Sequence, residues 1–128
     1  MATNLEVAII DDDESIRTAT SGLVRSLGWA ARTYSSAQAF LAAAGHASAT
    51  CIISDIQMPA MSGLELLRLL RAQGSEIPVI FITAFCTEAI RREALRAGAV
   101  AFLCKPVNGA EIQHCLEIVA SGSPAGPR

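Results

Sequence analysis

The sequence has no surplus of basic residues. Its 128 residues carry 10 Lys and Arg against 12 Asp and Glu, so the formal net charge is -2. Proteins that grip nucleic acid do so largely by neutralising phosphates with a basic surface. We therefore expect no nucleic acid contact by this domain itself.

Long apolar runs are also missing. No stretch approaches the roughly 18 to 20 apolar residues that cross a bilayer. The first residues, Met1 to Glu6, lack the basic and apolar regions of a secretory signal. These absences predict a cytoplasmic protein with no membrane partner.

Cysteine is sparse, and its spacing contains no CxxC pair. Cys51, Cys86, Cys104 and Cys115 are far apart and lie mostly within apolar runs. Such placement is typical of reduced, buried thiols and argues against a disulfide framework or a zinc site. We expect four core thiols.

The apolar content suffices for one core. At 128 residues and 52% hydrophobic content, the chain has the size of a single domain, and two full domains are excluded. We predict a domain over residues 1–120. Residues 121–128 are rich in Ser, Gly and Pro and are typical of a linker or a frayed tail.

Apolar runs alternate with amphipathic stretches, a pattern typical of repeated βα units and a parallel sheet. The predicted strands are Val7–Ile10, Ala31–Tyr34, Cys51–Ser54, Val79–Thr83 and Val100–Cys104. The second strand is mixed, as an edge strand can be. A first helix carries Ile16, Ala19, Thr20, Leu23, Val24 and Leu27 at helical spacing. The other predicted helices are Ser36–Ala44, Ser62–Gln73, Thr87–Ala97 and Gly109–Ala120.

Polar residues gather where the predicted strands end. The chain has only four aspartates, three of them in the run Asp11 to Asp13 and the fourth at Asp55, and its one lysine is Lys105. With Thr83, these residues follow or end four different strands. Parallel α/β sheets bind ligands at that edge, so we expect one site there. Asp13 is excluded, because its position before the first helix is typical of an N-cap.

Three carboxylates at one edge repel each other by roughly 4 kcal/mol per pair at ~4 Å and an effective dielectric of 20. A cation must therefore join them, and oxygen-only ligands favour Mg²⁺ or Mn²⁺. Carboxylate, metal ion, hydroxyl and ammonium together suit phosphoryl transfer to an acid side chain. The predicted acceptor is Asp55. Taken singly, Thr83 is as typical of a β-branched strand residue.

Four segments, in order, carry a family resemblance: Ile10–Arg17, Ser54–Glu65, Pro78–Ala84 and Gly98–Pro106. They resemble the receiver domain of bacterial two-component response regulators, most of all the FixJ/NarL type. The resemblance implies a flavodoxin-like (βα)5 three-layer sandwich with parallel strand order 2-1-3-4-5.

The resemblance also implies a metal site. Asp55 matches the phosphoacceptor and a metal ligand, and Asp12 matches a direct ligand of Mg²⁺ or Mn²⁺. Asp11 would hold the ion largely through water, and the backbone carbonyl of Gln57 would be a further ligand.

The resemblance implies that the remaining matched positions form a switch. Thr83 and Lys105 would contact the phosphoryl oxygens, and the bond from Lys105 to Pro106 would be cis. Phe102 matches an aromatic residue that turns inward when the threonine moves.

The resemblance implies a phosphorylation-dependent switch and not an enzyme. The switch would assist its own phosphoryl transfer and dephosphorylation. Its donor would be a sensor histidine kinase, and its output a transcriptional domain. A homodimer through the fourth helix, fifth strand and fifth helix is possible, although Ala101 stands where OmpR-like members carry an Asp for dimer contacts. The alternatives are a stand-alone receiver and a pseudo-receiver that act only through protein contacts. An aspartate-nucleophile phosphatase is disfavoured, since it needs an acid at the position of Gln57.

Overall fold

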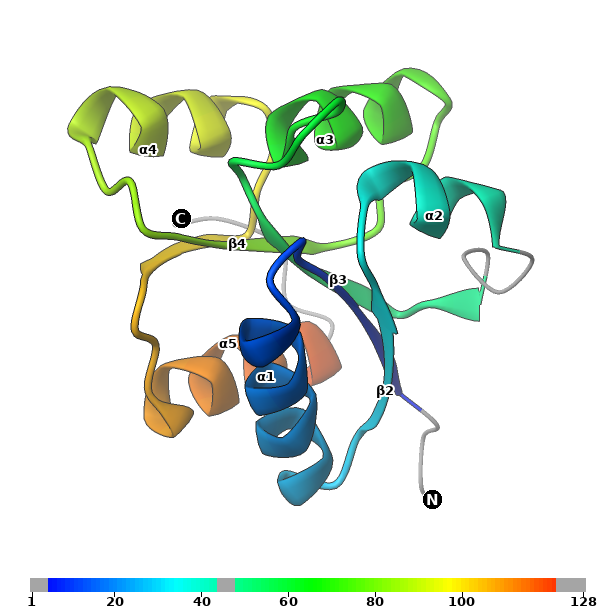
Figure 1. Ribbon diagram of the computed structural model, residues 1–128, viewed down its shortest axis with the longest axis vertical. Helices are drawn as coiled ribbons and strands as arrows, with labels where there is room; N and C mark the ends of the chain where they lie inside the picture. The colour runs from blue at the N-terminus through cyan, green and yellow to red at the C-terminus, as the bar shows by residue number, and fades with distance from the viewer. Residues whose placement is uncertain (1–4, 44–47, 122–128) are drawn as a thin grey trace.

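The structure, a computed structural model, describes residues 5–43 and 48–121. Strands and helices alternate along the chain. They are β1 (Glu6–Ile10), α1 (Glu14–Ser26), β2 (Ala30–Tyr34), α2 (Ala37–Ala42), β3 (Cys51–Asp55), α3 (Gly63–Ala72), β4 (Val79–Thr83), α4 (Glu88–Arg96), β5 (Ala101–Cys104) and α5 (Gly109–Ser121). All strand pairs are parallel, in the order β2-β1-β3-β4-β5 (Figure 1). The predicted fold is confirmed.

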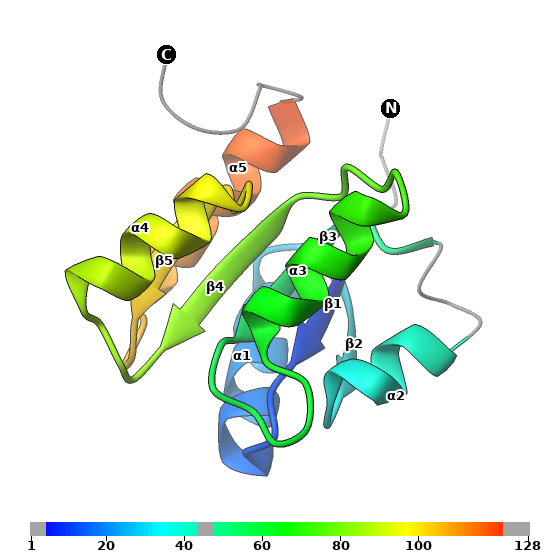
Figure 2. The same cartoon turned by 90° about the horizontal axis from the view of Figure 1, so that it is seen from above.

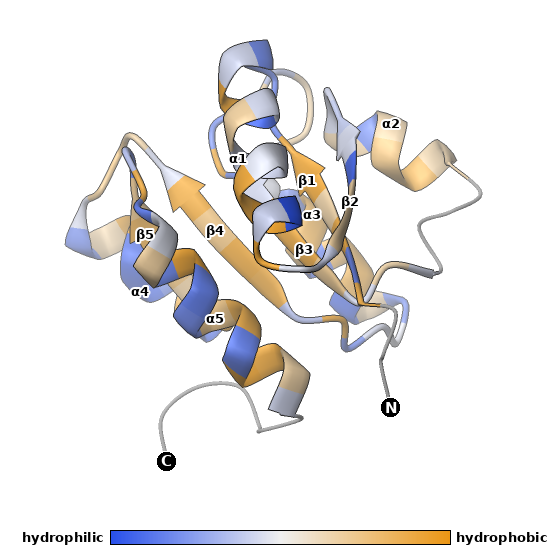
Figure 3. Cartoon of the chain, turned by 90° about the horizontal axis from the view of Figure 1, so that it is seen from below, coloured by the Kyte–Doolittle hydropathy of each residue, from blue (hydrophilic) through white to orange (hydrophobic). Residues whose placement is uncertain are grey.

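The sheet lies between two layers of helices. Helices α1 and α5 cover one face, and α2, α3 and α4 cover the other (Figures 1 and 2). Successive strand residues point to opposite faces, so Ile52 packs in the core beneath α2 to α4, whereas Ile53 packs in the core beneath α1 and α5. The central strands β3 and β4 are buried on both sides. Figure 3 shows that their residues are mostly hydrophobic.

The strand β2 lies at an edge of the sheet, as its mixed sequence predicts. Ala31 is buried, whereas Arg32 and Thr33 are exposed. An edge strand has a sheet neighbour on one side only, so polar side chains along it remain solvated.

Side-chain caps determine where the helices begin. Asp13 accepts a hydrogen bond from the backbone N–H of Ile16 at 3.1 Å, so the N-cap prediction is confirmed. The predicted starting residues Ser36, Ser62 and Thr87 cap α2, α3 and α4. Each such cap contributes about 1 kcal/mol.

Two helix predictions need adjustment, and one falls partly outside the described residues. Ala19 is exposed, because its neighbour Thr20 takes the buried position on α1. The expected end of the second helix at Ala44 lies outside the described residues. Helix α5 includes Ser121, one residue past the predicted domain boundary, and residues 122–128 are not described. No helix in the described ranges is long and apolar enough to span a membrane.

The prediction of four buried thiols is wrong for two of them. Cys86 and Cys104 form a disulfide, with their Cα atoms 5.8 Å apart, and both residues are exposed. The other two, Cys51 and Cys115, are buried free thiols, as expected. Burial raises the pKa of Cys51 to about 12. The pairing follows from the sheet, since Thr83 and Cys104 are register partners and Cys86 lies three residues beyond Thr83.

Candidate functional site at the carboxyl edge of the sheet

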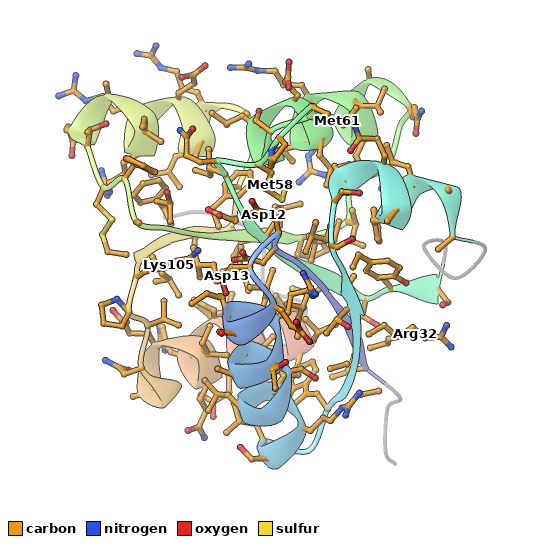
Figure 4. The ribbon with its side chains drawn as sticks, in the orientation of Figure 1. Asp12, Asp13, Arg32, Met58, Met61 and Lys105 are labelled. Atoms are coloured by element: carbon orange, nitrogen blue, oxygen red, sulfur yellow. A yellow bond between two sulfur atoms is a disulfide. The ribbon has the colours of Figure 1, made fainter. Side chains whose placement is uncertain are left out.

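The polar residues predicted to form a site share one edge of the sheet. Asp11 follows β1, Asp55 ends β3, Thr83 ends β4 and Lys105 follows β5. Because the strands are parallel and in register, their carboxyl ends meet at this edge. Figure 4 shows Asp12 and Lys105 there, whereas Arg32 lies away from them on β2.

Three carboxylates converge at this edge. Oxygen atoms of Asp11, Asp12 and Asp55 lie within 4.8 Å of one another. Asp11 is completely buried, whereas its neighbour Asp12 is exposed. Water therefore reaches the cluster from the side of Asp12, and the opposite side is closed by protein.

The two carboxylate oxygens of Asp11 have different polar neighbours. Its Oδ1 accepts a hydrogen bond from the backbone N–H of Asp13 at 2.9 Å. Its Oδ2 is buried, lies 3.1 Å from the ammonium of Lys105, and has no hydrogen bond of good geometry within the described residues. A buried carboxylate oxygen with incomplete coordination favours a further cation or an ordered water beside it.

Lys105 bridges two of the acids. Its Nζ lies 3.1 Å from Asp11 Oδ2 and 3.3 Å from Asp55 Oδ2, and its side chain is 18% exposed. Partial burial by itself lowers the pKa of Lys105, but the close ion pair with Asp11 and the charge of Asp55 outweigh it, and the net shift is upward. The lysine therefore remains a cation held between two carboxylates.

The carboxylate of Asp55 is fixed by its own backbone. Oδ1 accepts hydrogen bonds from the N–H groups of Ile56 at 2.7 Å and Gln57 at 3.4 Å. Burial raises the pKa of Asp55, the charge of Lys105 lowers it, and the charge of Asp11 raises it, with a net upward shift. Oδ2 is left facing Lys105.

The donor set fits a hard divalent cation. Three carboxylates supply oxygen ligands, the site is open on the side of Asp12, and neither His nor Cys belongs to the group. Mg²⁺ prefers such sites, because it binds through one or two carboxylates and keeps several waters. Asp11, Asp12 and Asp55 are the residues that would hold it. The backbone carbonyl of Gln57 stays a predicted ligand.

One residue that supports the site escaped the sequence argument. A Cβ atom on Gly63 would lie 2.3 Å from the backbone oxygen of Asp55 and 2.8 Å from Phe81 Cε1. The N–H of Gly63 donates to the carbonyl of Ile56 at 2.9 Å. The first turn of α3 thus packs directly on the end of β3. The signal was a glycine directly after the N-cap Ser62, since glycine has a low helix propensity.

The predicted switch residues lie on the paired strands β4 and β5. Thr83 is buried, and its hydroxyl accepts a hydrogen bond from the N–H of Phe85 at 3.0 Å. Phe102 is half-buried on β5 and is the register partner of Phe81. The peptide bond from Lys105 to Pro106 is cis, which confirms that expectation.

The disulfide is the second feature of this edge that the sequence argument missed. Cys104 directly precedes Lys105, and the Cys86 sulfur lies 3.5 Å from the carbonyl oxygen of Thr83. No local pattern signals the pair, because the two cysteines meet only when β4 and β5 are paired in this register.

Comparison with known proteins agrees with this geometry. The response regulator receiver domain family matches residues 7–117. Response regulator protein TmoT of Ectopseudomonas mendocina is 42% identical over 100 residues, which are 78% of this chain and 46% of TmoT. Transcriptional regulatory protein FixJ of Azorhizobium caulinodans is 40% identical over 112 residues, 88% of this chain and 53% of FixJ. The chain thus spans about half the length of these curated relatives.

Solved structures give the same result. The structure described as the crystal structure of FixJ-N superposes with a TM-score of 0.83 at 34% identity, over 98% of this chain and 100% of that one. The chain belongs to the response regulator receiver family and is a receiver domain of the FixJ type, as the sequence resemblance implied.

Proposed function

We propose that this receiver domain accepts a phosphoryl group on Asp55 from a phosphohistidine of a sensor histidine kinase. The observation that carries the proposal is the position of Lys105, whose ammonium lies 3.1 Å from Asp11 and 3.3 Å from Asp55. The acceptor carboxylate, the lysine cation and the additional acids therefore lie together at one edge of the sheet. Small phosphoryl donors would serve the same site.

The two oxygens of Asp55 take different roles. Oδ1 is held by the N–H groups of Ile56 and Gln57, which orients the carboxylate. We assign Oδ2, which faces Lys105, as the nucleophile. The bond from Oδ2 to phosphorus forms as the bond from phosphorus to the kinase imidazole breaks, and its electron pair leaves with the imidazole. Positioning and charge stabilisation provide most of the catalysis of such transfers.

Charge at the site is balanced by two cations. A bound Mg²⁺ or Mn²⁺ would neutralise charge on the phosphoryl oxygens and the acids. The residues that would hold it are Asp11, Asp12 and Asp55, with the carbonyl of Gln57. Lys105 would move from the carboxylates toward a phosphoryl oxygen, since its flexible stem carries a point charge. The same groups would assist hydrolysis of the acyl phosphate, so the domain would assist its own dephosphorylation.

The phosphoryl group would change the surface through Thr83. Its hydroxyl would exchange the N–H of Phe85 for a phosphoryl oxygen, and Phe102 would turn inward behind it. The surface of α4, β5 and α5 would then present a new shape. Phe85 is 56% exposed beside this surface and is available to a partner.

The partners follow from the family. We infer a cytoplasmic protein in which the switched surface controls a transcriptional output domain, because the matching relatives include a transcriptional regulatory protein and are about twice as long as this chain. We further propose a second copy of the chain as a partner, in a homodimer through α4, β5 and α5. A pseudo-receiver is disfavoured, since each acid, the Thr and the Lys is present at the edge.

The test is intact-mass spectrometry after incubation with acetyl phosphate and Mg²⁺. We expect one phosphoryl adduct that is labile to alkali and absent from Asp55→Asn and from a sample with chelator. Asp13→Asn is the matched control, because Asn also caps helices, and it should keep the adduct. Absence of both the adduct and Mg²⁺ binding would support the pseudo-receiver.

A further inference from the structure

The β4–α4 loop is tied to the end of β5 by a covalent bond that the phosphorylation site does not need. Cys86, in this loop, is joined to Cys104, the last residue of β5. The loop begins at Thr83 and the strand leads into Lys105, so the bond connects the neighbours of both groups proposed to contact the phosphoryl oxygens.

Noncovalent contacts hold the same loop in place. The N–H of Lys105 donates to the carbonyl of Thr83 at 2.8 Å. The hydroxyl of Thr83 accepts the N–H of Phe85 at 3.0 Å. The disulfide adds a third restraint, which blocks any motion that separates residue 86 from residue 104. A cross-link of this kind reduces the conformations open to the loop.

The chemistry of the pair is set by its exposure. Both cysteines of the disulfide are exposed, so a reductant reaches them, whereas the other two thiols are buried in the core under α1 and α5. Burial raises the pKa of both core thiols and keeps them in the unreactive thiol form. The exposed disulfide is therefore the accessible target of thiol reductants.

We propose that Cys86 and Cys104 form a reversible redox modification site that sets how readily Asp55 is phosphorylated. In the oxidised form the disulfide holds the β4–α4 loop against β5 and keeps the Thr83 hydroxyl on the N–H of Phe85. In the reduced form the loop is released, and Thr83 is free to turn toward a phosphoryl group. This inference rests on the proposed phosphoacceptor function.

The exchange balances with ordinary thiol chemistry. A thiolate of a dithiol reductant attacks one sulfur of the disulfide, the S–S bond breaks, and the other cysteine leaves as a thiolate that takes up a proton. The second thiol of the reductant then displaces the first cysteine, so the reductant is oxidised to its own disulfide. Hydrogen peroxide would reverse the change by taking two electrons and two protons from the thiols and forming two waters.

The direction of the effect follows from population shift. The disulfide is formed in the unswitched arrangement, and in our proposal the switched arrangement moves the β4–α4 loop away from β5; the disulfide then stabilises the unswitched arrangement, and phosphorylation must work against it. Coupling between two sites in one domain typically amounts to a factor of roughly 5 or more. Because the proposed reaction needs Thr83 to leave the N–H of Phe85, the same free energy adds to its barrier, and we expect the reduced protein to be phosphorylated at least about fivefold faster than the oxidised protein.

The experiment compares oxidised and reduced wild-type protein with phosphoramidate and Mg²⁺, after the reductant has been removed. Intact-mass spectrometry reports both the phosphoryl adduct and the two hydrogens gained on reduction. The double variant Cys86→Ser, Cys104→Ser should match the reduced protein and ignore reductant. Cys115→Ala removes a thiol outside the disulfide and should keep the redox response.

The possible outcomes separate the two proposals. A faster reaction after reduction, absent from the double variant, supports the redox site. Equal rates for oxidised and reduced protein, or no disulfide after oxidation, would overturn it and leave the phosphoacceptor function standing. Failure of both forms to be phosphorylated would overturn both. The wild-type comparison needs no substitution, so the test holds even if a variant fails to fold.

Discussion

Replacing Asp55 with Asn should stabilise the metal-free protein. The carboxylate of Asp55 is attracted to Lys105 at 3.3 Å, which is worth about 5 kcal/mol at an effective dielectric of 20. It is also repelled by the buried Asp11, within 4.8 Å, by about 3.5 kcal/mol, and by the exposed Asp12 by about 1 kcal/mol, because water screens an exposed charge. Attraction and repulsion therefore nearly cancel, and the cost of burying the carboxylate, about 2 kcal/mol, decides the sign. Asn removes all three charge interactions and can keep the hydrogen bond from Ile56.

The effect should depend on pH in a defined direction. The pKa of Asp55 is raised in the folded protein, with burial as the first cause, so its charged form costs stability. The cost is absent well below the ordinary pKa of about 4, where the carboxyl is protonated in both states, and it is fully present above the raised pKa. The advantage of Asp55→Asn should therefore grow as the pH rises from about 4 toward neutrality.

Thermal unfolding in EDTA at neutral pH measures this prediction. A gain of about 2 kcal/mol corresponds to a rise in Tm of about 5 to 10 °C for a domain of this size. Mg²⁺ at 100 times its Kd should raise the free energy of unfolding of the wild type by about 2.7 kcal/mol and that of the variant by less. Asp13→Asn is the control and should leave the Tm nearly unchanged. A variant that melts below the wild type in EDTA would refute the reasoning.

Three further predictions concern the lysine, a glycine and a cap. Lys105→Met should lower the free energy of unfolding of the metal-free protein by about 3 kcal/mol, because it leaves buried acids unpaired. The same variant should bind Mg²⁺ more tightly in titration calorimetry, since a competing cation is gone. Weaker binding would contradict this prediction. Gly63→Ala should lower the free energy of unfolding in urea by about 3 kcal/mol, because its Cβ would meet the backbone of Asp55. Gly22→Ala, with nothing within 4 Å, should raise it by about 0.5 to 1 kcal/mol, and equal effects of the two would sink the packing argument. Ser62→Ala should cost about 1 kcal/mol in the same assay by removing the cap of α3, and no change would show that the cap is dispensable.

Local patterns predicted most of the fold. The five apolar runs and the amphipathic stretches between them predicted all the strands and helices that the structure contains. The residues Ser36, Ser62 and Thr87 marked three helix starts correctly. Such signals work because capping and periodicity act within a few residues. The strand order, by contrast, came from the resemblance to a family.

The edge site was predicted as a set of residues but not as a geometry. Parallel strands bring their carboxyl ends together, so Asp11, Asp55 and Lys105 were expected at one edge, and the structure places them there. The difference in burial between the acids could not be predicted from the sequence. Asp11 is completely buried and Asp12 is exposed, although the two are neighbours in the chain.

The sequence by itself determined the succession of strands and helices along the chain, the capped helix starts and the residue types that reach the carboxyl edge of the sheet. Tertiary structure alone decided that Gly63 packs on the end of β3 and that Cys86 meets Cys104. The physical reason is range: a cap or an apolar period acts over one turn, whereas burial and cross-links depend on which strands become neighbours in the sheet. Cys86 and Cys104 are 18 residues apart and meet because β4 pairs with β5 in one particular register.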